Sequence, residues 1–255
     1  DEYRRRFPGR EDVMSLLEVT GDGAAPAIWS GGRQGVAVVD QDTGRLLRWL
    51  QIDGPDESLK LEYVTSLAIG PGNQGDPGAA VWVGHYRGLS YRPLGQGHGG
   101  GAWQTLTVAD GLPSNEVLTL CFSRRAGLWV GTRGGLARLR TASPPMVEAV
   151  YTQANGLAGD AASVLWEDSR GRLWVGGGYA NQPGLSMFDG ERWTAFTTAD
   201  GLAHDMVNAI LATPGGELLI GTGFSSRGGA TLYDGTSWAP LEAGPQGGPL
   251  PAALA

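Results

Sequence analysis

The apolar positions of this chain fall into short runs that glycine-rich or polar turns separate. Between residues 115 and 152 there are four such runs, at 115–122, 127–132, 135–140 and 147–152. Runs of about six residues bounded in this way predict β-strands, and connections of about five residues suit hairpins. A crossover helix would need about a dozen residues, so the pattern favours antiparallel pairing and excludes parallel βαβ units.

The same pattern recurs along the chain around a Trp-x-Gly sequence. The first position of this sequence is a tryptophan four times and a leucine the fifth time, at intervals of 53, 47, 45 and 45 residues. These residues are Trp29, Trp82, Trp129, Trp174 and Leu219. Such self-similarity at a nearly fixed period is the signature of a repeat protein.

Two further markers keep the same period. The segments 109–117, 154–162 and 199–207 all begin with Ala-Asp-Gly-Leu or Ala-Asn-Gly-Leu, and they lie 45 residues apart. Asp-Gly turns at 188–193 and 233–238 are also offset by 45 residues. A four-stranded antiparallel sheet repeated at this interval predicts an all-β fold, the β-propeller with four-stranded blades.

We expect a single propeller domain that spans residues 1–255 and contains five repeats. Two arrangements remain open: a closed ring of five blades, or five blades of a larger propeller. In the second arrangement the end blades would expose unpaired faces, which favour aggregation. The repeats are expected at about 11–54, 60–112, 115–157, 160–202 and 205–243, with a tail at 244–255.

The repeated residues have a structural interpretation. Trp129 lies in a predicted interior strand and can fill the wedge between adjacent blades. Burial of such a ring removes about 150–250 Å² from water, which is nominally about 4–6 kcal/mol. Gly131, two residues later, would permit close approach of a neighbouring backbone. The remaining regular tryptophans, Trp103, Trp193 and Trp238, are expected in the hairpin cores.

Composition narrows the classes of function. The chain has 43 glycines, a single lysine (Lys60) and a formal net charge of −7. Nucleic-acid binding usually needs a basic surface, so this charge argues against it. No apolar run is long enough to span a bilayer, so we expect no membrane contact by this segment. Cys121 is the single cysteine, which excludes an intrachain disulfide.

The motif N-x-V-x-x-L … G-x-L-W-V-G-T-x-x-G-L, preceded by D-G-L, resembles the two-component regulator propeller repeat. The best matches lie at 109–139, 154–188 and 199–222; overall the resemblance is good over 60–240 and loose over 10–50. It implies a sensor propeller of a bacterial hybrid histidine kinase, in the periplasm or outside the cell. Some members bind oligosaccharides. The start of the chain shows no signal peptide, and no kinase sequence is present.

The turns between the second and third strands of each repeat carry the candidate ligand site. In a propeller these turns and the segments that cross between blades share one face. Four of the five turns place an arginine near their closing glycine, and several add an aromatic or amide side chain, which suits a polar or anionic ligand. The candidate residues are Arg33, His85, Tyr86, Arg87, Arg133, Tyr179, Asn181, Gln182, Phe224 and Arg227. Alternatively, each arginine binds an acidic crossing segment, which contains Asp110, Asp160, Asp200 or Asp205.

The sequence favours a non-enzymatic sensing or interaction domain. Its partner would be a small polar ligand or oligosaccharide, or a flanking signalling domain. One alternative is a lyase or hydrolase similar to streptogramin lyase, for which only His85 and His204 could serve; another is a structural scaffold module. No motif indicates a cofactor, and the separated histidines do not predict a metal site.

Overall fold

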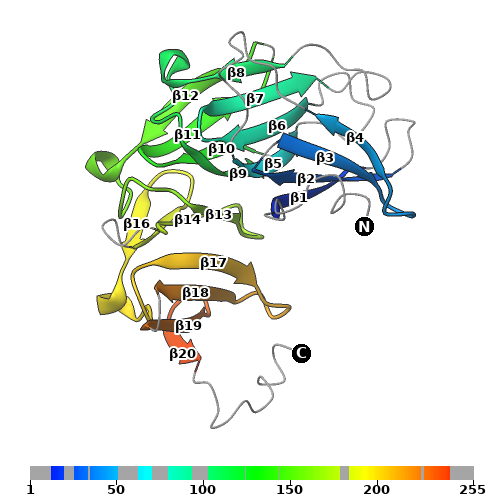
Figure 1. Ribbon diagram of the computed structural model, residues 1–255. Helices are drawn as coiled ribbons and strands as arrows, with labels where there is room; N and C mark the ends of the chain where they lie inside the picture. Colours follow the sequence, from blue (N-terminus) through cyan, green and yellow to red (C-terminus); the bar gives the residue numbers. More distant parts are fainter. Residues whose placement is uncertain are drawn as a thin grey trace. The chain divides into compact units, whose positions relative to one another are not determined.

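The computed structural model describes residues 13–19, 26–33, 35–50, 63–70, 80–93, 103–123, 125–142, 144–178, 184–224 and 227–241. Within these ranges the strands form five four-stranded sheets, in each of which the strands follow the order of the chain (Figure 1). The first two strands of every sheet pair antiparallel. The predicted all-β architecture of four-stranded blades is therefore confirmed.

The chain divides into two compact units. The first comprises residues 1–133 and 137–150, and the second comprises residues 134–136 and 151–255. We number the blades 1 to 5 along the chain. Nearly all of blades 1–3 belongs to the first unit, whereas blades 4 and 5 belong to the second. No helix in the described ranges is long and apolar enough to cross a membrane.

The strands of blades 1 and 2 are β1 (Val13–Val19), β2 (Ala27–Gly32), β3 (Gly35–Asp40), β4 (Leu46–Leu50), β5 (Val64–Gly70), β6 (Ala80–His85), β7 (Gly88–Pro93) and β8 (Gln104–Leu106). Those of blade 3 are β9 (Val117–Ser123), β10 (Gly127–Thr132), β11 (Gly135–Arg140) and β12 (Met146–Tyr151). Blades 4 and 5 consist of β13 (Val164–Glu167), β14 (Leu173–Gly176), β15 (Leu185–Phe188), β16 (Trp193–Phe196), β17 (Val207–Ala212), β18 (Leu218–Phe224), β19 (Arg227–Tyr233) and β20 (Trp238–Leu241).

The predicted strand bounds in the third repeat agree closely with the structure. The runs at 127–132 and 135–140 coincide with β10 and β11, and the run at 147–152 is displaced by one residue in β12. The run at 115–122 begins too early, because β9 starts at Val117. Asn115 belongs to the preceding connection, where its side-chain oxygen accepts a hydrogen bond from the Val108 N–H.

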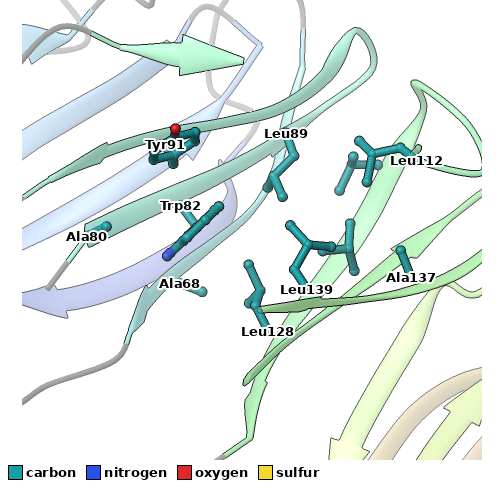
Figure 2. Packing of buried hydrophobic residues seen from close by; sticks show 11 residues of the cluster. Ala68, Ala80, Trp82, Leu89, Tyr91, Leu112, Leu128, Ala137 and Leu139 are labelled. Carbon is teal, nitrogen blue, oxygen red and sulfur yellow. The ribbon is translucent and has the colours of Figure 1, made fainter. Parts of the chain in front are cut away.

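In each unit the core lies between consecutive blades. The predicted tryptophans are buried. Trp29, Trp82, Trp129 and Trp174 are all between 0 % and 2 % exposed. Trp82 belongs to a cluster that joins blade 2 to Leu128 and Leu139 of blade 3 (Figure 2). Trp29 lies in the corresponding cluster of blades 1 and 2, and Trp174 in that of blades 4 and 5. The wedge-filling role is confirmed for these three rings.

The glycine of the Trp-x-Gly sequence receives a valine from the next blade. A Cβ atom added at this glycine would lie 2.5–2.7 Å from a valine Cγ1, which is closer than real Cβ contacts allow. The valine begins, or nearly begins, the first strand of the next blade and is fully buried. The pairs are Gly31 with Val64, Gly84 with Val117 and Gly176 with Val207. We refer to this contact as the glycine–valine lock.

The crossing segments between blades owe their shape to their Asp-Gly-Leu sequence. In the first of these segments, Asp110 ends the short 3-10 helix η1 (Val108–Asp110), and its carboxylate accepts a hydrogen bond from the Thr107 N–H at 2.9 Å. Gly111 follows in the left-handed conformation, and Leu112 is buried in the core of blades 2 and 3. The segment at η3 (Thr198–Asp200) repeats this arrangement. The segment at η2 (Gln153–Asn155) has Asn155 in place of the aspartate, and its Gly156 has a φ of +132° outside the left-handed helical conformation.

Candidate functional site

The turns between the second and third strands lie beside the crossing segments, as the propeller interpretation requires. In the first unit, the Arg33 guanidinium lies 4.8 Å from the ring centroid of Tyr63, which immediately precedes β5. The Tyr63 ring is stacked on Tyr86 of the β6–β7 turn, with 5.2 Å between centroids and 21° between planes. The Arg33–Tyr63–Tyr86 stack thus joins the turns of blades 1 and 2 through the segment that connects these blades.

Tyr63 was not among the candidate residues, although it is the centre of this stack. It has a φ of +69°, a left-handed conformation that no other non-glycine residue in the described ranges adopts. Such a conformation costs about 1–3 kcal/mol and persists only when surrounding contacts impose it. Here the Tyr63 N–H donates to the Arg33 carbonyl oxygen at 3.2 Å. The available sequence signal was its position, directly before the lock valine of β5, where the next repeat has Glu116.

His85 is buried and acts on the turn that carries Tyr86 and Arg87. Its side chain is only 5 % exposed, and its Nδ1 accepts a hydrogen bond from the Arg87 N–H at 3.2 Å. Nε2 must therefore carry the proton of the neutral ring, and it donates to Ser90 Oγ at 2.8 Å. Ser90 Oγ in turn lies 2.7 Å from Thr105 Oγ1. Both ring nitrogens are thus used within the protein.

The pKa of His85 agrees with this network. Burial, together with the positive charge of Arg87, lowers the pKa of His85 to about 4. The ring is consequently neutral at pH 7 and can hold the turn without a competing charge. His85 was a predicted ligand contact, but its geometry is that of a positioning residue for Tyr86 and Arg87. Those two residues are exposed.

Arg133 contacts an acidic crossing segment, but through Glu116. The Arg133 guanidinium forms an ion pair with the Glu116 carboxylate at 2.8 Å, and the backbone N–H of Arg133 donates to the Glu116 carbonyl oxygen at 3.0 Å. The two side chains are 55 % and 40 % exposed, so this pair adds at most about 1 kcal/mol to stability.

The aspartates expected as arginine partners hold their own crossing segments together. Asp160 accepts a hydrogen bond from the Gln153 N–H at 2.6 Å, and Asp205 accepts one from the Thr198 N–H at 2.6 Å. Asp200 does the same for the Thr197 N–H at 2.8 Å. Asp200 thus repeats the role of Asp110, whereas Asp160 and Asp205 repeat that of Asn115. The cause of these contacts is local, because each carboxylate satisfies a backbone N–H at the start of a 3-10 turn.

The second unit shows the same proximity of turns and crossing segments. The Val207 N–H donates to the Gly177 carbonyl oxygen at 3.0 Å, and the Gly184 N–H donates to that of Asp205 at 2.7 Å. Arg227 begins β19, is exposed and pairs with Phe224 across the hairpin. The predicted contacts Tyr179, Asn181 and Gln182 lie outside the described residues, as does the side chain of Phe224.

The histidines do not form a metal centre with other ligand-type side chains in the described ranges. No group of three or more His, Cys, Asp or Glu side chains there could hold an ion. His204 Nδ1 accepts a hydrogen bond from the Met206 N–H at 2.9 Å, which closes a local turn. His204 thus resembles His85 in supporting the backbone of a connection.

Comparison with known proteins finds similarity at the level of structure. No family model matches the chain, and no curated protein matches it. The extracellular domain of the putative hybrid two component system BT3049 from B. thetaiotaomicron is similar, with a TM-score of 0.65 and 16% identity over 91% of this chain. That of the putative one component system BT4673 from the same organism has a TM-score of 0.65 and 20% identity over 92% of this chain.

A third similar structure, YCF48 from Cyanidioschyzon merolae, has a TM-score of 0.60 and 11% identity, and the match covers 93% of this chain and 74% of that one. The two bacterial matches cover much less of the other protein. The chain spans only 34% of the BT3049 domain and 28% of the BT4673 domain. These likenesses show the fold: the chain is built of the same kind of propeller blades as the extracellular domains of these two signalling proteins.

Proposed function

We propose that this chain is a non-enzymatic sensing or interaction propeller that binds a polar, oligosaccharide-like ligand at the turn face of its first unit. The observation that carries the proposal is the Arg33–Tyr63–Tyr86 stack. It places a cation and two aromatic rings side by side on connections rather than in the core. Tyr86 is 40% exposed, although large aromatic side chains are usually covered.

The chemistry of the stack suits a sugar. An exposed aromatic ring offers an apolar surface to the C–H groups of a pyranose, while the exposed Arg87 supplies donors for hydroxyl or carboxylate oxygens. Two or three charge-assisted hydrogen bonds, at about 1.5–3 kcal/mol each, support roughly millimolar to micromolar affinity. A sensor that must release its ligand operates well in this range.

Pre-organisation also supports a binding role. Tyr63 retains an unfavourable backbone conformation, and His85 holds the backbone of the Tyr86–Arg87 turn through its buried ring. Fixing the rings before the ligand arrives lowers the entropic cost of binding. A purely structural turn would not need an exposed aromatic residue supported in this way.

The cellular setting follows from the similar structures. The BT3049 and BT4673 matches are described as extracellular domains of signalling systems. By analogy, we place this chain in the periplasm or outside the cell, with a flanking signalling domain as the partner that would receive the binding signal. The lyase or hydrolase alternative has less support, because both ring nitrogens of His85 are already engaged within the protein.

The proposal can be tested by a thermal-shift screen with neutral and uronate-containing oligosaccharides, followed by calorimetry. Tyr86→Ala should weaken binding about five- to thirtyfold, because a stacked aromatic face contributes about 1–2 kcal/mol. Leu47→Ala is the matched control, since Leu47 is also 40 % exposed in the first unit but lies in β4. Unchanged binding in Tyr86→Ala would contradict the proposed site, and the absence of any ligand would favour a scaffold role.

A further inference from the structure

The crossing segment at η2 contains an asparagine where its two counterparts contain an aspartate. The pair Asn155–Gly156 stands at the place of Asp110–Gly111 and Asp200–Gly201, with 45 residues between equivalent positions. No other asparagine of the chain is followed by a glycine. An asparagine in this setting can react with the peptide nitrogen of its neighbour, because glycine has no side chain that shields this nitrogen.

The backbone nitrogen of Gly156 differs from those of its counterparts in its hydrogen bonding. The N–H groups of Gly111 and Gly201 each donate to the carbonyl oxygen three residues earlier, at 3.2 and 3.3 Å. Gly156 forms no such bond with Gln153, which lies at that distance within the described segment. The nitrogen that would act as the nucleophile is therefore engaged in the two Asp-Gly segments but not in the Asn-Gly segment.

The side chain of Asn155 is accessible to water and polarised by a backbone donor. Asn155 is exposed, and its Oδ1 accepts a hydrogen bond from the Thr152 N–H at 2.5 Å. A donor on the amide oxygen stabilises the negative charge that develops there when a nucleophile attacks Cγ. The segment thus presents both an activated amide carbon and the water that later steps require.

The glycine of this pair is fixed by the fold. Gly156 has a φ of +132°, which side chains rarely allow, and a Cβ added to it would lie 2.6–2.8 Å from atoms of Trp193. A larger residue at this position would therefore strain the backbone and displace the tryptophan. The fold keeps the glycine, so an asparagine before it always forms the reactive pair.

We propose that Asn155 is a deamidation site of the folded chain, whose product gives this segment the Asp-Gly form of its counterparts. The Gly156 nitrogen loses its proton and bonds to Asn155 Cγ, the Cγ–NH2 bond breaks, and ammonia leaves with that proton. Water then opens the resulting cyclic imide. Cleavage of the new Cγ–N bond gives aspartate, whereas cleavage of the original peptide C–N bond gives isoaspartate.

The segment at η3 shows that the fold accepts the aspartate. There Asp200 accepts hydrogen bonds from the N–H and the hydroxyl of Thr197, while Asp205 accepts one from the next N–H along the chain. Asp160 is the equivalent of Asp205, so η3 already accommodates the two carboxylates that deamidation would place at η2. A carboxylate is also a stronger acceptor than an amide. Isoaspartate adds a methylene group to the main chain and would disrupt this turn.

Peptide mapping of the full chain by mass spectrometry, during incubation in mildly alkaline buffer, tests the proposal. The exchange of NH2 for OH changes the mass of the peptide that contains Asn155. We expect this conversion at Asn155, whereas Asn208, which is also exposed but precedes an alanine, should stay intact. An unmodified Asn155, or equal conversion of Asn208, would overturn the proposal.

Asp200→Asn provides a matched control within the same molecule. It creates a second Asn-Gly pair with the same flanking residues, an alanine before it and Leu-Ala after it, but with the glycine N–H engaged. The new pair should react about fivefold more slowly than Asn155, the effect of one backbone hydrogen bond. In urea, which removes the fold, the two rates should become equal. Equal rates in the folded protein would overturn the role of the Gly156 nitrogen.

Asn155→Asp tests whether the product suits the fold. Its melting temperature should equal or exceed that of the wild type, because the carboxylate caps the Thr152 N–H as Asp200 caps that of Thr197. A lower melting temperature would contradict the inference that deamidation restores the form of the other segments.

Discussion

The two units contain the same kind of blade contact but stabilise it in different ways. In the first unit, hydroxyl groups join the first strands: Ser66 Oγ accepts a hydrogen bond from the Leu120 N–H at 3.1 Å, as Ser15 Oγ does from Leu67 at 3.0 Å. Thr65 Oγ1 adds a third contact, to the Val117 carbonyl oxygen at 2.9 Å. β5 and β9 are edge strands of their sheets, so their outward backbone groups have no ladder partner, and the hydroxyls satisfy them.

The second unit has Val164 and Ala209 at the serine positions, so it cannot form the two serine bonds. Instead, aromatic rings gather between blades 4 and 5. Trp174 contacts Phe196 and Tyr233, with ring centroids 5.8 and 5.5 Å apart. Tyr233 is also stacked on Trp238 at 4.3 Å. The glycine–valine lock is therefore common to both units, whereas the contacts around it differ: hydroxyl groups in the first unit and aromatic rings in the second.

The largest expected difference between the units is in the loss of stability when the central tryptophan is replaced. Trp174→Ala and Trp82→Ala should each lower the free energy of unfolding by about 3–5 kcal/mol, with Trp174→Ala at the upper end. Trp174 contacts two rings, and its indole N–H donates to Asp168 at 3.0 Å, whereas the Trp82 indole N–H is buried without a hydrogen bond. Urea unfolding followed by intrinsic fluorescence measures the difference. An equal or larger loss for Trp82→Ala would contradict the assigned roles of the aromatic contacts.

The second-largest expected difference between the units is in how their stability depends on pH. His85 titrates near pH 6.5 when unfolded and near pH 4 when folded, so the unfolded chain binds more protons between these values. Stability of the first unit therefore falls as the pH decreases from 6.5 to 4, by up to about 3 kcal/mol.

Urea unfolding at pH 7.0 and pH 4.5 measures this loss. His85→Gln should remove most of the dependence in this window. The carboxyl groups with lowered pKa values, such as those of Asp168 and Asp234, lose their contribution mainly below their ordinary value of 3.8. An unchanged pH dependence in His85→Gln would show that another group is responsible.

Filling the glycine positions tests the feature that the units share. Gly84→Val in the first unit and Gly176→Val in the second should each destabilise by about 1–3 kcal/mol, because the added atoms overlap Val117 and Val207. Gly221→Val, which meets no neighbouring blade, should change stability by less than about 0.5 kcal/mol. Thermal unfolding of the three variants gives the comparison. Equal losses at all three glycines would indicate an effect of the strand rather than of the lock.

The smallest expected effect concerns the hydroxyl contacts. Ser66→Ala leaves the Leu120 N–H without its partner, and in this half-buried position the loss should be about 1 kcal/mol. Hydrogen exchange of the Leu120 amide should accelerate correspondingly. Val164→Ala, at the equivalent place in blade 4, alters no such bond and should leave the first unit unchanged. Slow exchange at Leu120 in Ser66→Ala would refute the proposed role of the serine.

The sequence predicted the parts of the fold that depend on period and residue size. The tryptophans and the blade type follow from a fixed spacing of large, small and turn-forming residues. The glycine was expected to admit a neighbouring backbone, whereas at Gly31, Gly84 and Gly176 a valine side chain fills the space. The site was less predictable, because it depends on irregular residues. Tyr63 carries no motif, and the burial of His85 depends on Ser90 and Thr105 in two other strands. Arg133 pairs with Glu116 rather than Asp110, whose carboxylate already accepts hydrogen bonds from the N–H and the hydroxyl of Thr107.

The most direct test of the account is a titration of the protein, carrying ¹³C-labelled tyrosine, with the best oligosaccharide from the screen, followed by NMR. Tyr→Phe substitutions would assign the ring signals of the seven tyrosines. We expect the signals of Tyr63 and Tyr86 to shift together, while those of Tyr151 and Tyr233 in the second unit stay in place. Shifts at Tyr151 or Tyr233 without any at Tyr63 and Tyr86 would contradict a ligand site on the turn face of the first unit.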